Sequence, residues 1–160
     1  MIYCMDTSFW ITAWNDLYRP SKFPSIWDDI EKMIERNEII SPMEVKEELK
    51  PKDKTMLKWL NDRSQLFLEL SEPEQRLLSE LLGKFRNLNV VGGTTQPADP
   101  YVIAIARIRN ATVVTDERPS GGQDLKSNPF AAKKIPDVCT ALNLKWLGVS
   151  GFVNQMPGQK

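Results

Sequence analysis

Short apolar runs alternate with helix-forming segments along the whole chain. Buried strands are predicted at residues 2–5, 38–40, 111–115 and 145–149, and a strand or a connector at 66–70. Helices are predicted at 9–14, 25–36 and 137–142, and from about 41, 53, 71 and 100 onwards. Residues 118–134 are polar and predict a long surface loop. Strands that alternate with helices favour a parallel sheet with crossover helices, so the sequence predicts one α/β domain.

Acidic residues stand where these strands end or these helices begin. Asp6 and the pair Asp116-Glu117 each follow a predicted strand, while Asp99 and one glutamate within residues 44–48 lie near predicted helix starts. The carboxyl ends of parallel strands share one edge of the sheet, so acids far apart in sequence can converge there. Clustered carboxylates repel one another unless a cation lies among them. Because a hard divalent ion such as Mg²⁺ prefers oxygen ligands, the pattern predicts a metal site.

Each of these acids also has an ordinary structural role. Asp6 and Asp99 would make good helix N-caps, and Asp116 with Glu117 would suit a turn. The alternative interpretation is therefore purely structural, with every acid in a cap or a turn. The metal-site interpretation is favoured because all of them fall at the edge where α/β proteins place their ligands.

Two segments, 41–44 and 71–74, match the capping-box pattern of a helix start. Each has a serine, a proline in the first helical turn and a glutamate three residues after the serine. Ser41 and Ser71 are therefore predicted N-caps.

The acid of the helix after residue 41 must be chosen among Glu44, Glu47 and Glu48. A helix advances about 100° per residue, and Val45 with Leu49 marks its buried side. Glu47 then lies opposite that side, Glu48 borders it, and Glu44 lies further round on the same flank. Glu44 is assigned to the capping box. Glu48 is the preferred metal candidate, because a bound cation would stabilise an acid beside an apolar stripe.

The sequence contains no histidine, which excludes several classes of active site. Ser-His and Cys-His nucleophile systems and His-ligated zinc sites all need this residue. The 21 basic residues balance the 21 acidic ones, so no global positive field attracts nucleic acid and any such contact must be local. Carboxylate and metal chemistry, or binding, remain.

The apolar runs are interrupted by charge, and the N-terminus lacks the basic flank of a signal peptide. No membrane segment is expected, and the predicted location is the cytoplasm. Cys4 and Cys139 lack metal-site spacing and are predicted to be buried thiols in a reducing compartment.

Taken in order, these motifs resemble those of PIN-domain proteins of the VapC-like toxin type. The resemblance covers residues 1 to about 150 and is carried by residues 5–8 (Met-Asp-Thr-Ser), Ser41 with 48–49 (Glu-Leu), 98–99 (Ala-Asp) with 103–104 (Ile-Ala), and 113–117 (Val-Val-Thr-Asp-Glu). Residues 23–27 and 134–139 further resemble a PIN-like subfamily of small, mostly uncharacterised proteins.

The resemblance implies a three-layer α/β/α sandwich with a central parallel sheet, here a PIN-like domain at 1–150 followed by a C-terminal tail at 151–160. It also implies a Mg²⁺- or Mn²⁺-dependent endoribonuclease, the toxin of a toxin–antitoxin pair. Two points stay open: the family's serine spacing would favour Glu47 over Glu48, and the fourth acid is either Asp116 or Glu117. A noncatalytic PIN-like module that binds RNA or protein is the alternative function.

The mechanism expected from this resemblance uses four carboxylates to hold one or two divalent ions. The candidates are Asp6, Glu48, Asp99, and Asp116 or Glu117, with Ser8 and Thr115 as residues that could orient the attacking water.

RNA is the expected substrate and a cognate antitoxin the expected partner, while a homodimer remains open. Trp10 and Trp14 lie one helical turn apart, just after Asp6. If they are exposed, they would anchor the antitoxin beside the acids; if they are buried, they belong to the core.

Overall fold

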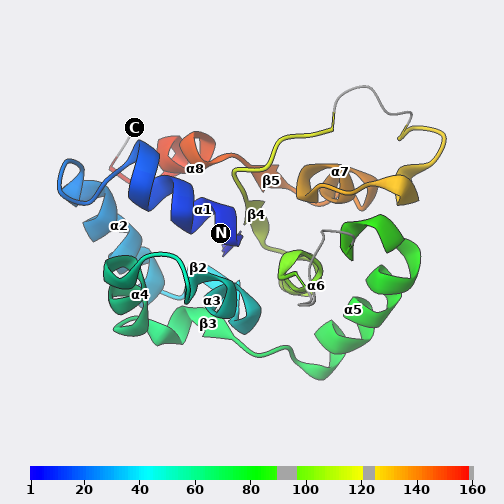
Figure 1. The fold of residues 1–160 in the computed structure, drawn as a ribbon, viewed down its shortest axis with the longest axis horizontal. Helices are drawn as coiled ribbons and strands as arrows, with labels where there is room; N and C mark the ends of the chain where they lie inside the picture. The colour runs from blue at the N-terminus through cyan, green and yellow to red at the C-terminus, as the bar shows by residue number, and fades with distance from the viewer. Residues whose placement is uncertain (90–96, 121–124, 159–160) are drawn as a thin grey trace.

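The centre of the fold is a parallel sheet of short strands (Figure 1). The computed structural model describes residues 1–89, 97–120 and 125–158. Within them the strands are β1 (Tyr3–Met5), β2 (Ile39–Pro42), β3 (Phe67–Leu68), β4 (Thr112–Val114) and β5 (Trp146–Leu147). They lie in the order β3-β2-β1-β4-β5, and every neighbouring pair is parallel. The central strand β1 therefore has its carboxyl end between those of β2 and β4.

Helices connect the strands and cover both faces of the sheet. They are α1 (Thr7–Thr12), which continues as a π-helical turn (Ala13–Leu17), α2 (Pro24–Glu35), α3 (Met43–Leu49), α4 (Lys54–Asn61), α5 (Glu72–Lys84), α6 (Asp99–Arg109), α7 (Ile135–Ala141) and α8 (Val149–Gln155). Short 3₁₀ turns occupy Ser64–Leu66, Arg86–Asn89 and Pro129–Ala131. In the part of the chain that the structure describes, none of these helices has the length and apolar character needed to cross a membrane.

Two adjacent residues of β1 demonstrate the layering. The ring of Tyr3 meets Phe152 of α8 edge to face at 4.9 Å between ring centroids. Its neighbour Cys4 points to the opposite face, where its thiol lies 3.7 Å from the carbonyl oxygen of Val102 in α6. Helices α1, α2 and α8 thus lie on one side of the sheet and α6, with α5 against it, on the other (Figure 1). The predicted three-layer α/β/α sandwich with a parallel sheet is confirmed.

The central strands are buried on both faces. Cys4, Met5, Val113 and Val114 have no exposed surface. A strand covered by helices on both sides needs a continuous apolar run rather than alternation, which is the pattern from which these strands were predicted. Both cysteines are buried free thiols, as expected.

The predicted capping box at Ser41 is wrong. Ser41 is the third residue of β2 and is completely buried, and α3 begins at Met43 with Pro42 as its N-cap. The Ser41 hydroxyl donates to the carbonyl oxygen of Met5 at 2.8 Å and accepts from the indole of Trp10 at 3.3 Å. A hydroxyl buried inside the sheet needs a partner there, so it serves the neighbouring strand and not the helix start.

The domain continues beyond residue 150. The predicted tail at 151–160 begins inside α8, where Phe152 and Val153 are buried in the core, and the strand predicted at 145–149 ends at Leu147. Val149, at the end of that predicted strand, already begins α8, so an apolar residue there did not mean a longer strand. Part of the predicted loop, 121–124, lies outside the described residues.

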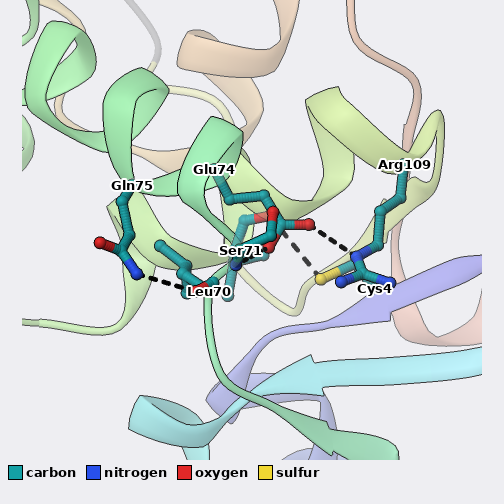
Figure 2. A network of polar contacts seen from close by, with 7 residues as sticks. Cys4, Leu70, Ser71, Glu74, Gln75 and Arg109 are labelled. Atoms are coloured by element: carbon teal, nitrogen blue, oxygen red, sulfur yellow. Dashed lines mark hydrogen bonds and ion pairs between the residues drawn. The ribbon is translucent and has the colours of Figure 1, made fainter.

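The second capping box, at Ser71, is present and connects α5 to α6 (Figure 2). The carboxylate of Glu74 accepts the backbone N–H of Ser71 at 2.7 Å and the Nε–H of Arg109 at 2.6 Å. Burial alone would raise the pKa of Glu74, but these donors outweigh it and hold the pKa below its ordinary value. The ion pair ties the start of α5 to the end of α6.

Replacing Glu74 by alanine should lower the free energy of unfolding by about 2 kcal/mol, because it removes both a helix cap and a charge-assisted hydrogen bond. Glu74 is only 1% exposed, whereas Glu72 in the same turn is 82% exposed and pairs with Arg76. Glu72→Ala is therefore the control and should change stability by less than about 0.5 kcal/mol. Urea unfolding measures both, and equal losses would contradict the structural role assigned to Glu74.

Candidate active site

Asp6 is a buried carboxylate at the carboxyl end of β1. Only 2% of the residue is exposed. One oxygen accepts the backbone N–H of Thr7 at 2.7 Å, and the other accepts the hydroxyls of Ser8 at 2.7 Å and Thr115 at 2.9 Å. Asp6 therefore caps α1, as the structural interpretation expected, and also joins the ends of β1 and β4. A cap and a site residue are compatible roles for the same carboxylate.

Glu48 reaches the same edge of the sheet from α3. Its two carboxylate oxygens accept the backbone N–H of Ala98 at 2.6 Å and the hydroxyl of Thr7 at 2.7 Å. Glu47 is exposed and pairs with Lys50 instead. Glu48 and not Glu47 therefore lies at this edge, as its position on the helix predicts and contrary to the serine spacing of the family. Thr7 is not among the site residues predicted from the sequence. The one sequence feature that could have indicated its role is its position directly after Asp6.

Asp99, the first residue of α6, lies among the other carboxylates. Burial, followed by the negative charges of Asp6, Glu117 and Glu48 in that order of strength, together raise its pKa to about 8. The pKa of Asp6 is also raised, first by burial and then by the charge of Glu117 against the opposing effect of its hydrogen bonds. Acids from four separate segments therefore act on one another at this edge.

The fourth acid in this group is Glu117 and not Asp116. Asp116 is exposed, and its carboxylate accepts the hydroxyl of Thr12 at 2.9 Å. Glu117 turns inward: its backbone N–H donates to the hydroxyl of Thr115 at 3.0 Å, and its carboxylate accepts the backbone N–H of Ile135 at 2.8 Å. The choice that the sequence left open is made by this turn.

Ser8 and Thr115 hold the carboxylates in place. Each hydroxyl donates to the same oxygen of Asp6, Ser8 Oγ accepts the backbone N–H of Asp116 at 2.9 Å, and Thr115 Oγ accepts that of Glu117. The two hydroxyl oxygens are also 3.2 Å from each other. Ser8 and Thr115 therefore position Asp6, and their role in orienting a water molecule stays a prediction.

Glu44, the remaining candidate on α3, is not used in a capping box. One of its carboxylate oxygens is buried and has no hydrogen-bond partner among the described residues. Burial raises its pKa, and the charges of Glu69 and Glu47 add to the effect. The acids that raise its pKa are thus these two glutamates and not the acids around Asp99, and Glu44 in turn raises the pKa of Tyr101 in α6.

The two tryptophans of the first helical segment do not form an exposed pair. Trp10 is fully buried, and its indole N–H donates to Ser41. Trp14 is half-buried and packs edge to face on Trp27 at 4.9 Å, with Trp59 at 6.0 Å. The aromatic anchor predicted for an antitoxin is therefore wrong for Trp10, which belongs to the core.

The acids Asp6, Glu48, Asp99 and Glu117, called here the acid cluster, suit a hard divalent cation by their chemistry. All four provide oxygen ligands. Repulsion from the other three raises the pKa of Asp99, so a cation among them would stabilise its charged form. In the described parts of the chain, however, no three Asp, Glu or Cys side chains are already gathered as a metal-binding group. Each carboxylate offers about four lone-pair positions, so the protein donors on Asp6 and Glu48 leave capacity for an ion. The donors fit, and side-chain adjustment would complete the site.

The chain belongs to the family described as "Domain of unknown function (DUF4411)", whose model matches residues 3–157. No curated protein matches the sequence. A solved structure similar to this one is VapBC2 from Rickettsia felis bound to a DNA fragment from its promoter. The identity is 20% and the TM-score 0.51, over 92% of this chain and 98% of the other. At that identity the likeness concerns the fold alone, and it agrees with the three-layer α/β/α sandwich described above.

The metal-free protein should lose stability as the pH rises from about 4 to about 8. Because the pKa of Asp99 is raised in the folded state to about 8, the folded protein binds more protons than the unfolded chain across this range. The loss is about 1.4 kcal/mol for each unit that separates the two pKa values. Asp99→Asn removes the charge and should flatten the profile, whereas the exposed Asp116→Asn should not. Urea unfolding in EDTA at several pH values measures this, and a stability that rises with pH would contradict it.

Proposed function

We propose that this protein is a Mg²⁺- or Mn²⁺-dependent endoribonuclease. The observation that carries the proposal is the acid cluster. Its four carboxylates come from separate segments and lie close enough at this edge of the sheet for three of them to raise the pKa of the fourth, Asp99, together with burial. Such a group is costly to maintain without a cation. The absence of histidine agrees with chemistry that relies on carboxylates and a metal.

Each residue of the site has a distinct part in this reaction. Asp6, Glu48, Asp99 and Glu117 would hold the ion, which when bound lowers the pKa of a water molecule and stabilises negative charge on the scissile phosphate. Thr7 keeps the Glu48 carboxylate turned toward the start of α6. Ser8 and Thr115 keep Asp6 in one orientation, so little rearrangement of that ligand is needed when substrate binds.

We further propose that the protein acts as a toxin controlled by an antitoxin protein. The support is the VapC-like fold together with the structural neighbour, which is itself a VapBC complex on promoter DNA. An antitoxin would act most directly by covering the acid cluster. A cytoplasmic location follows from this role.

One observation favours the alternative, a noncatalytic PIN-like module that binds RNA or protein. Every carboxylate oxygen of Asp6 and Glu48 already accepts a hydrogen bond from the protein. In a module that had lost its metal, such bonds alone would stabilise the buried acids. Metal binding separates the two functions.

Purified protein should cleave a mixed pool of single-stranded RNA when Mg²⁺ or Mn²⁺ is added and stop when EDTA is added. Asp6→Asn and Asp99→Asn should each reduce the rate at least about 100-fold, because either change removes one ligand charge from the ion. Asp116→Asn is the matched control and should retain wild-type activity, since its carboxylate faces Thr12 on the surface. Single-stranded DNA of the same length tests whether the substrate is RNA.

Isothermal titration with Mn²⁺ accompanies the activity assay. Binding by the wild type, lost in Asp99→Asn, is expected of a nuclease. Wild-type protein that binds no Mn²⁺ and leaves RNA intact would favour the noncatalytic module.

Glu48→Gln should reduce cleavage far more than Glu47→Gln, although the residues are adjacent. Glu48 is held in the acid cluster by Thr7 and Ala98, whereas Glu47 is exposed and paired with Lys50. A loss of at least tenfold is expected for Glu48→Gln and less than twofold for Glu47→Gln, on the order expected for a ligand and for a surface charge. Initial rates at saturating Mg²⁺ measure both. The reverse order would mean that the ligand is Glu47.

A further inference from the structure

Lys134 is held near the acid cluster by a hydrogen bond of the residue that follows it. It directly precedes α7, and the backbone N–H of the next residue, Ile135, donates to the carboxylate of Glu117 at 2.8 Å. This bond ties the start of α7 to a member of the cluster. Lys134 is thus held beside the acids although 17 positions separate it from Glu117 in the sequence.

Lys134 also supplies positive charge to the cluster. Burial and three carboxylates raise the pKa of Asp99, and the charge of Lys134 acts in the opposite direction and lowers it. The side chain is exposed, and across residues 1–89, 97–120 and 125–158 no carboxylate lies within ion-pair distance of its ammonium. Arg109 and Arg63, in contrast, are each committed to a glutamate.

An ammonium in this position, with no ion-pair partner among the described residues, meets a requirement of the proposed substrate. The acid cluster repels a polyanion, and the chain as a whole has no net charge to offset that repulsion. Attraction must therefore come from a cation near the acids. A lysine suits this task because its ammonium is a mobile point charge that can reach a phosphate oxygen.

We propose that Lys134 binds a backbone phosphate of the RNA and positions the strand over the acid cluster. The proposal rests on the ribonuclease function proposed above and adds a substrate-binding residue to it. Lys134 acts on the phosphate by charge and by hydrogen bonding, with no part in bond cleavage. It supplies positive charge beside the carboxylates.

The neighbouring Lys133 provides a matched control. Both side chains are exposed. Lys134 is among the groups that most shift the pKa of Asp99, and Lys133 is not. Lys133 therefore has the same charge and nearly the same place in the chain, without the same effect on the acid cluster. A nonspecific effect of net charge would change both variants equally.

The test measures binding of a fluorescent single-stranded RNA in Ca²⁺, without cleavage, and steady-state cleavage in Mg²⁺. Lys134→Met should weaken RNA binding and raise KM about tenfold, the value of one charge-assisted hydrogen bond, with kcat within about twofold of wild type. The salt dependence of log Kd should fall by about 0.7, the contribution of one phosphate contact on a single strand. Lys134→Arg should restore binding, and Lys133→Met should stay within about twofold of wild type.

Equal effects of Lys134→Met and Lys133→Met, in a wild type that cleaves RNA, would overturn this proposal and leave the ribonuclease function intact. A fall in kcat with unchanged KM and RNA binding would overturn it as well. A wild type that neither binds nor cleaves RNA would overturn both. Urea unfolding of each variant verifies that the comparison is between folded proteins.

Discussion

The buried carboxylate of Asp6 is the interaction on which the rest of the site depends. It accepts hydrogen bonds from Thr7, Ser8 and Thr115, and thereby joins the start of α1 to the end of β4. A charged group with 2% exposure is stable only if such donors satisfy it. Two of these residues also position the other acids. The Thr7 hydroxyl donates to Glu48, and the Thr115 hydroxyl accepts the backbone N–H of Glu117.

The acid cluster is a local weakness in an otherwise well-packed α/β/α sandwich. Burial and three negative neighbours keep the pKa of Asp99 far above its ordinary value, so the folded state loses free energy as this group ionises. Proteins tolerate strain of this kind where function requires it. A divalent ion would offset the negative charge of the carboxylates, and an RNA phosphate would offset the positive charge of Lys134.

Much of the fold could be predicted because parallel strands buried on both faces require continuous apolar runs. Glu48 was chosen over Glu47 by helical phase, and the structure places it with the other acids because α3 is a regular helix. Ser41 was misassigned since a serine before a proline suits a helix cap and a strand end equally well. The boundary at residue 150 was placed too early because α8 is short and follows β5 with almost no loop.

The sequence by itself determined the order of strands and helices and the presence of acids at their junctions, because periodicity and capping are local properties. Only the tertiary structure decided which of Asp116 and Glu117 joins the cluster. That choice depends on contacts with Thr12 and Ile135, which are distant in the chain. Two adjacent acids in a turn have similar local preferences, and only partners brought close by folding distinguish them. Lys134 lies near the acids for the same reason. The hydrogen bond from Ile135 to Glu117 joins residues that are distant in the chain, and no local sequence pattern predicts it.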